Sequence, residues 1–200
     1  GTLAPREEVV ELINKVPPEV LLVMDEAYIE FLESPVDLLP LIRDGRKPNL
    51  LLMRTFSKIF GLAGLRLGYG IAVPELVSAL EKVRQPFNIN SLAQAAALAA
   101  LDDNEHLLKT RANNFQGLRF LENELRRLRL EFVPSSANFI MARVGDGQRV
   151  VGERQKLGVI ARAMGGYELP EWIRISIGTP AENQRCVEAL RQVCGQGTSN

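Results

Sequence analysis

The stretch Arg54–Gly70, RTFSKIFGLAGLRLGYG, decides the fold class of this chain. It follows the apolar run Asn49–Met53 and places Lys58 directly before a loop rich in glycine. The polar side chains around this lysine are two small hydroxyls and a guanidinium: Thr55, Ser57 and Arg66. A lysine at a strand end, with hydroxyls, a compliant loop and an arginine, is what a covalently held phosphorylated aldehyde requires. The stretch therefore predicts an α/β protein that binds pyridoxal phosphate.

The composition is that of an ordinary globular chain. Of its 200 residues, 46% are hydrophobic and 24% charged, which suits one large domain or two small ones. Lysine plus arginine equals aspartate plus glutamate, at 24 each, so no global charge favours nucleic acid or an anionic membrane as a partner. No apolar run approaches the roughly 20 residues of a membrane span. The N-terminal residues GTLAPREEVV lack the regions of a signal peptide.

Cysteine and histidine are scarce. Cys186 and Cys194 fall in one helical pattern, where eight residues rise about 12 Å, too far for a disulfide. We therefore expect a reducing, cytoplasmic compartment, and without a cysteine–histidine cluster we expect no metal site. The single histidine, His106, lies in a helix-start sequence and is expected at the surface. Lysine remains the principal candidate nucleophile.

The first half of the chain alternates apolar runs with helix-start signals. The runs predict strands at 20–24 and 49–53, each covered on both faces, and a glycine-rich strand at 66–72. The start signals predict helices at 5–15, 74–83 and 91–101. This alternation predicts an α/β sheet with mixed or parallel strands.

The pattern changes after residue 101. Leucines at spacings of three and four predict one long helix from Asp102 to Leu130. Strands are predicted at 131–133, 138–144, 158–162 and 172–177, with a helix ending at 157 and another over 180–194. We therefore predict two domains, residues 1–101 and an α+β domain over residues 102–200.

Further candidate site residues follow the first predicted strand. Asp25 ends that strand, and ligands of α/β sheets bind beyond the carboxyl ends of strands. Its carboxylate would keep a pyridinium nitrogen protonated, and Tyr28 would hydrogen-bond the ring's phenolic oxygen. Lys58 would form the Schiff base and move the substrate proton. Thr55, Ser57 and Arg66 would bind the phosphate.

Each of these features taken alone has a plainer interpretation. The segment Asp25–Tyr28 is also typical of a solvated acidic turn, and Lys58 of a surface lysine. The glycines match neither the dinucleotide-binding pattern nor a phosphate loop, and they would also serve as turn formers. Their joint occurrence at the ends of successive strands favours the cofactor site.

Five segments carry a family resemblance: MDEAYIEF, RTFSKIFGLAGLRLGYG, RQPFNINSLAQAAALAAL, PSSANFI and WIRISIGTPAENQR. From residue 1 to about residue 194 the chain resembles the histidinol-phosphate aminotransferases, pyridoxal-phosphate enzymes of fold type I. The resemblance implies part of the large cofactor domain over residues 1–101 and the small domain over residues 102–200. It also implies a homodimer when the protein is full length.

The resemblance assigns the same roles to Lys58, Asp25 and Tyr28, and makes Thr55, Ser57 and Arg66 the phosphate ligands. It adds Arg174 as the arginine that grips the substrate's carboxylate or an equivalent anion, and Arg162 as a second arginine near the substrate. From the residues alone, Arg174 alternates with apolar neighbours on a strand and faces away from them. An ordinary exposed arginine remains an open interpretation of both positions.

Two departures from the family pattern stand out. A phosphate-site loop, a gating segment and an asparagine-rich turn precede this region in the family, and Gly1-Thr-Leu resembles the end of that turn. We therefore expect a C-terminal portion of the enzyme, inactive by itself. The sequence ARAM at 161–164 also replaces a proline-containing run, which bears on the placement of Arg162.

The function implied is transamination in histidine biosynthesis. The enzyme would interconvert histidinol phosphate plus 2-oxoglutarate and imidazole-acetol phosphate plus glutamate. Alternatives are a threonine-phosphate decarboxylase, an aromatic aminotransferase, or a non-catalytic aminotransferase-like binding module of a transcription regulator. The partners expected are small-molecule substrates, with no nucleic acid, membrane or metal.

Overall fold

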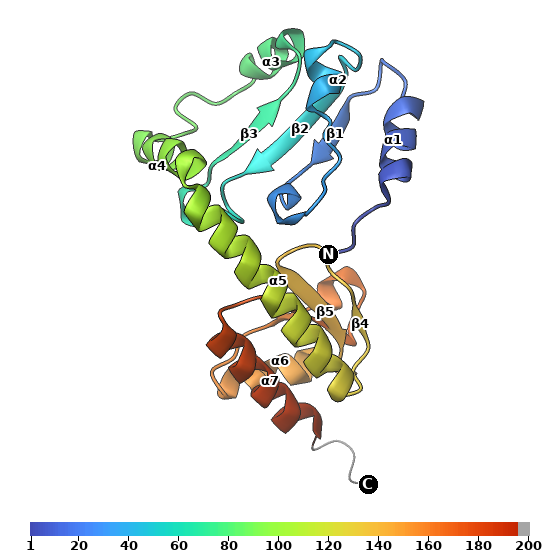
Figure 1. Cartoon of the computed structure of the whole chain (residues 1–200), viewed down its shortest axis with the longest axis vertical. Coiled ribbons are helices and arrows are strands. Elements are labelled where there is room, and N and C mark those ends of the chain that lie inside the picture. Colours follow the sequence, from blue (N-terminus) through green and yellow to red (C-terminus); the bar gives the residue numbers. More distant parts are fainter. Residues whose placement is uncertain (196–200) are drawn as a thin grey trace. The chain divides into compact units, whose positions relative to one another are not determined.

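The computed structural model describes residues 1–195 (Figure 1). Its contacts divide the chain into two units, Ala4–Leu108 and Gly1–Leu3 with Lys109–Asn200. These are called the N-terminal and the C-terminal unit below. The predicted domains, 1–101 and 102–200, stay a prediction, and residues 196–200 of the second lie outside the described residues.

A three-stranded mixed sheet organises the N-terminal unit. Strand β1 (Leu22–Asp25) is parallel to β2 (Leu50–Thr55), and β3 (Gly68–Ile71) is antiparallel to β2, in the order β1-β2-β3 (Figure 1). The helices are α1 (Arg6–Lys15), α2 (Leu39–Arg43), α3 (Pro74–Glu81) and α4 (Ser91–Asp102), with 3-10 turns η1 (Ile29–Phe31) and η2 (Ala63–Leu65). The predicted α/β class with a mixed sheet is confirmed.

The two apolar strands differ in burial. Residues 50–52 of β2 are buried on both faces, as predicted for 49–53, but Met53 of β2 is 45% exposed and Val23 of β1 is 44% exposed. The prediction that β1 is covered on both faces is therefore wrong. The reason is that β1 is an edge strand whose Leu22 and Met24 face a cluster around Ile13, Leu38 and Ile42, whereas Val23 and Asp25 point to the opposite, exposed face.

A four-stranded antiparallel sheet organises the C-terminal unit. Its order is β4 (Phe132–Val133), β5 (Phe139–Arg143), β7 (Trp172–Ser176) and β6 (Arg162–Ala163). The helices are α5 (Asn104–Arg127), α6 (Gly147–Lys156) and α7 (Pro180–Gly195), with a 3-10 turn η3 (Gly165–Tyr167). The core contains buried side chains of α5, β5, β7 and α7, among them Leu121, Leu125, Ile140, Ile173 and Leu190.

Two element predictions in this region are wrong in their bounds. The helix predicted over Asp102–Leu130 spans Asn104–Arg127. It begins later because α4 runs to Asp102 and Asp103 interrupts the helix to accept a hydrogen bond from the His106 backbone N–H at 2.9 Å. It ends earlier because Arg129 has a positive φ of 56°. The strand predicted at 158–162 starts only at Arg162, because Gly158 has a positive φ of 75° and begins a loop.

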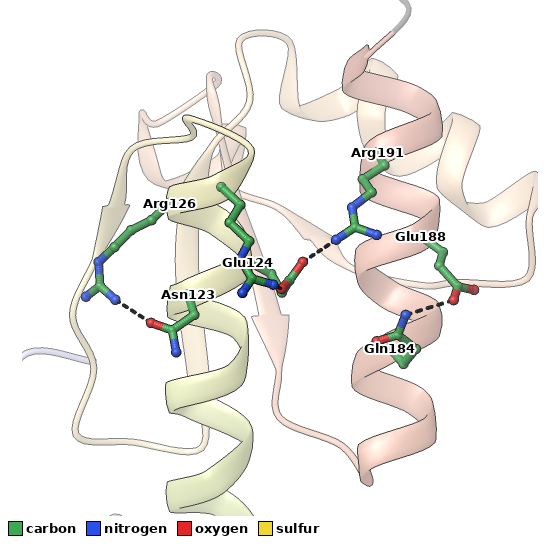
Figure 2. Close-up of polar contacts among 7 residues, drawn as sticks. Asn123, Glu124, Arg126, Gln184, Glu188 and Arg191 are labelled. Atoms are coloured by element: carbon green, nitrogen blue, oxygen red, sulfur yellow. Dashed lines mark hydrogen bonds and ion pairs between the residues drawn. The ribbon is translucent and has the colours of Figure 1, made fainter.

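A buried carboxylate joins α5 to α7 in the C-terminal unit. Glu124 of α5 is 4% exposed and bonds Arg191 of α7 (Figure 2). It also bonds Arg127 on its own helix. Along α7, the Gln184 amide donates to Glu188 at 2.9 Å (Figure 2). The negative charge of Glu124 thus has two positive partners, as a buried charge requires. Both cysteines of α7, Cys186 and Cys194, are free thiols.

Candidate functional site

A pocket of about 690 Å³ opens on the exposed face of the N-terminal sheet. The strand register aligns Asp25 with Met53 and Gly70, and Thr55 with Gly68. Residues that pair across neighbouring strands point to the same face, so this row forms the wall of the pocket. The polar side chains that line it include the following candidates: Asp25, Thr55, Ser57, Lys58 and Arg66.

Local hydrogen bonds hold the turn that carries Lys58. The Thr55 hydroxyl accepts from the Ser57 backbone N–H at 3.0 Å and lies 3.4 Å from the Leu67 carbonyl oxygen. Phe56 and Ile59 on either side of the turn are 4% and 1% exposed. Because these two apolar side chains anchor the turn, Ser57 and Lys58 stay at the pocket.

Tyr28 adjoins this pocket through Lys58. The Lys58 Nζ lies 5.4 Å from the centroid of the Tyr28 ring, within cation–π range. Tyr28 itself is not among the lining residues. Asp25 is exposed, and its Oδ1 accepts a hydrogen bond from the Ala27 N–H at 3.0 Å, which orients the carboxylate at the end of β1.

Arg66 sits in an uncommon backbone conformation at the end of η2. Its φ of 54° lies in the left-handed region, which non-glycine residues rarely occupy. Its Nη1 donates to the Ala63 carbonyl at 3.0 Å. The loop then returns closely to β2: a Cβ on Gly68 would lie 2.8 Å from the Arg54 carbonyl oxygen. Backbone strain and close approach at one loop are features of functional sites.

Sequence reasoning missed an ion pair beside the pocket. Arg54, which lines the pocket, donates from Nε to Glu26 Oε2 at 2.8 Å, and the two side chains are 20% and 8% exposed. Burial lowers the pKa of Arg54. The hydrogen bond and charge of Glu26, together with Tyr69, raise it by more, so the pKa lies above its ordinary value. The available signal was a pair of charged residues at the ends of two apolar strands.

The C-terminal unit contains the two predicted substrate arginines. Arg162 of β6 and Arg174 of β7 are direct cross-strand partners. Ile173 and Ile175 are buried, so Arg174 faces away from them, and its guanidinium carbon lies 5.0 Å from the Phe139 ring centroid. Two like charges opposite each other are unfavourable by themselves and become favourable around an anion.

Among the described residues, no helix is long and apolar enough to cross a membrane. Within the same part of the chain, no three His, Cys, Asp or Glu residues gather into a group that could hold a metal ion.

Comparisons with known proteins agree on one family. The family model described as aminotransferase class I and II matches residues 1–190. A histidinol-phosphate aminotransferase of Akkermansia muciniphila is 53% identical over 193 residues, which cover 96% of this chain and 53% of that protein. Histidinol-phosphate aminotransferase 2 of Ralstonia nicotianae is 52% identical over 202 residues, with 98% and 54% covered.

Solved structures agree as well. The crystal structure of histidinol-phosphate aminotransferase from Sinorhizobium meliloti in complex with pyridoxal-5'-phosphate matches with a TM-score of 0.86 and 33% identity. The match covers 98% of this chain and 54% of that one. The chain thus spans about half the length of the curated relatives it matches.

Proposed function

This chain belongs to the class I and II aminotransferase family, and from that premise we propose that the full-length protein is a pyridoxal-phosphate-dependent aminotransferase with Lys58 as its cofactor lysine. The observation that carries the proposal is the gathering of Asp25, Thr55, Ser57, Lys58 and Arg66 around one pocket. Two strand ends and the loop after β2 supply these groups, so they come together only in the folded unit.

The groups present suit pyridoxal phosphate chemically. An amine is available for the aldehyde and a carboxylate for the pyridinium nitrogen, while two hydroxyls and a guanidinium are available for the phosphate. The wall of the pocket is apolar where Leu51, Met53 and Leu80 line it, which suits a flat ring. Charged and apolar requirements of the cofactor are therefore both met.

Bound pyridoxal phosphate supplies an electron sink for bonds at the substrate's α-carbon. Lys58 would hold the cofactor through its amine, and once the substrate's amine has displaced it, the freed Nζ would take the proton that the substrate's α-carbon loses. Asp25 would be the partner of a ring nitrogen and the Tyr28 hydroxyl of a ring oxygen. Thr55, Ser57 and Arg66 would hold the phosphate.

The proposed reaction interconverts histidinol phosphate plus 2-oxoglutarate and imidazole-acetol phosphate plus glutamate. Support comes from the names of the relatives and from the cross-strand pair Arg162 and Arg174, which offers two guanidinium groups to a carboxylate or phosphate. We assign these two arginines to substrate binding.

We place the enzyme in the cytoplasm, within histidine biosynthesis. The free thiols of Cys186 and Cys194 support a reducing compartment. The resemblance to fold-type I enzymes supports a homodimer of the full-length protein.

The test replaces Lys58 in the full-length protein. Lys58→Ala is expected to lose borohydride trapping of the cofactor and to lower amino transfer from histidinol phosphate at least about 100-fold. Lys82→Ala, an exposed lysine of the same unit, is the matched control and should keep both. Full turnover by Lys58→Ala would refute the assignment. Release of carbon dioxide from threonine phosphate, in place of amino transfer, would indicate a decarboxylase.

A further inference from the structure

The C-terminal unit buries a cation that has no carboxylate partner among residues 1–195. Arg154 of α6 is 0% exposed, and its Nε and Nη1 have no hydrogen-bond partner among the described residues. Its Nη2 donates to the Sγ of Cys186 on α7 at 2.8 Å. A guanidinium keeps its charge in proteins, so a full positive charge lies in the core of this unit.

The same unit shows how a buried charge is ordinarily accommodated. Glu124 is 4% exposed and pairs with Arg191 (Figure 2) and with Arg127. No such ion pair forms at Arg154 within the described part of the chain. Burying an unpaired charge is strongly unfavourable, so a neutralising group is expected at this place.

The neighbouring thiol does not supply the missing negative charge. Burial raises the pKa of Cys186 above its ordinary value, and the charge and hydrogen bond of Arg154 offset this only in part. Cys186 therefore stays a neutral thiol near pH 7 and acts as a weak hydrogen-bond acceptor.

A pocket of about 400 Å³ adjoins this cation. Its lining includes Arg154, Cys186, Ser176 and a second arginine, Arg185 of α7. Arg185 uses Nη2 on the Leu157 carbonyl at 3.2 Å and has further N–H groups on the same fork. Arg154 is fully buried behind the wall of this pocket, so an anion there would lie beside its charge, whereas Arg185 is exposed and can be contacted directly.

Two acceptor side chains at this pocket are already engaged within the fold. Glu182, the one carboxylate among the described residues of the lining, accepts from the Thr179 backbone N–H at 2.7 Å and from its hydroxyl at 2.9 Å, which holds the start of α7. Asn183, 3% exposed, exchanges hydrogen bonds with Gly178 at 2.9 and 3.1 Å. What remains for a ligand is a surplus of N–H donors and positive charge.

We propose that this pocket, enclosed by α6, β7 and α7, binds a small oxyanion that neutralises Arg154, with Arg185 as the second cation. The chemical class is phosphate-like or carboxylate, because both accept from guanidinium groups in a forked geometry. All residues involved belong to the C-terminal unit, and none is a candidate residue of the Lys58 pocket.

The test follows heat unfolding of the full-length protein loaded with its cofactor. Inorganic phosphate should raise the unfolding midpoint by a few degrees over sodium chloride of equal ionic strength, since a ligand of the folded state stabilises it. Sulfate and acetate arms distinguish a tetrahedral oxyanion from a carboxylate. If phosphate, sulfate and acetate all act no better than chloride, the proposal is overturned.

Single substitutions show which residues the stabilising anion needs. Arg154→Met should lose the anion response and unfold no earlier than the parent without anion, because an apolar side chain of similar length replaces an unpaired charge. Arg185→Gln should raise the anion concentration needed for the same shift about tenfold, because it removes a charged hydrogen-bond donor. This variant tests the proposal if Arg154→Met does not fold. Arg149→Met, on the same helix but exposed, should respond like the parent.

Two further variants separate this site from the proposed active site. Arg66→Gln and Arg174→Gln should keep the full anion response, because neither residue lines this pocket. Loss of the response in either variant, with Arg154→Met unaffected, would assign the anion to the cofactor or substrate site and overturn the inference. The outcome of the Lys58→Ala test, whichever way it falls, does not affect the anion response measured here.

Discussion

Glu26 and Arg54 bring opposite charges together at the carboxyl ends of β1 and β2. Their 2.8 Å contact is largely removed from water, and it lies next to the strand ends that present Asp25 and Lys58. Glu30 lies near this pair, and its Oε2 is buried without a hydrogen-bond partner in the described structure. The charges of Glu26, Arg54 and Glu30 therefore influence one another.

Glu30→Gln should stabilise the full-length protein at pH 7. Burial raises the pKa of Glu30 above its ordinary value of 4.5, and the nearby charge of Arg54 offsets this only in part. The folded state therefore holds this proton to higher pH than the unfolded state, and stability falls as pH rises from about 4.5 through the folded pKa. Glutamine removes that loss because it stays neutral.

The measurement is urea denaturation of parent and variant over a range of pH. The advantage of Glu30→Gln should disappear below about pH 4.5. Glu33→Gln, at an exposed position nearby, is the control and should show no such difference. A Glu30→Gln protein less stable than the parent at pH 7 would mean that the carboxylate is needed as a partner of Arg54.

At the scale of elements, helix α6 contains one glycine that close backbone contacts require and one that they do not. Gly147 begins the helix, and a Cβ there would lie 2.7 Å from the carbonyl oxygens of Pro170 and Trp172. Gly152 in the middle of the same helix has no atom within 4 Å of such a Cβ. The first glycine is required by packing, whereas the second only costs helix stability.

Alanine substitution of these two glycines should therefore act in opposite directions. Gly147→Ala is expected to destabilise the protein by about 1–3 kcal/mol through overpacking against backbone. Gly152→Ala is expected to stabilise it by about 0.5–1 kcal/mol through helix propensity. Chemical denaturation of both variants checks this. Equal effects would show that the loop at Pro170 yields to the added methyl group.

At the scale of the whole molecule, the chain consists of two units with separate cores. One unit presents the Lys58 pocket, and the other presents Arg162 opposite Arg174. Helix α5 is continuous through residues 108 and 109, where the contact division falls. Each unit can therefore be tested by itself, the N-terminal one through Lys58 and the C-terminal one through Arg174.

Arg174→Gln in the full-length protein should raise KM for histidinol phosphate and 2-oxoglutarate about 10- to 100-fold, because it removes a charged hydrogen-bond donor for their anionic groups. Steady-state kinetics measures this, and cofactor absorbance should be unchanged. Arg143→Gln on neighbouring β5, where Arg143 pairs with Glu131 and Glu171 on the surface, is the control. An unchanged KM for both substrates in Arg174→Gln would remove Arg174 from substrate binding.

Local sequence determined the strands that bear the candidate residues and the order in which those residues follow them. Apolar runs and turn signals act over a few residues, so β2, the turn at Lys58 and the outward direction of Arg174 were predictable. Local sequence did not predict three other features: the Glu26–Arg54 pair, the pairing of Arg162 with Arg174 across two strands, and the exposed face of β1. Each depends on which segments distant in sequence become neighbours and in what register.

The stretch Arg54–Gly70 shows both what the sequence determined and what only the tertiary structure decided. Its residue types alone indicated a lysine-held phosphorylated aldehyde, because amine, hydroxyl and guanidinium chemistry belongs to the side chains themselves. Only the tertiary structure decided that Asp25 joins Thr55 and Lys58 in one pocket, and that Arg154 lies buried with no carboxylate partner in the described part of the chain. Side-chain chemistry is a property of sequence, whereas burial and partnership arise when the chain packs against itself.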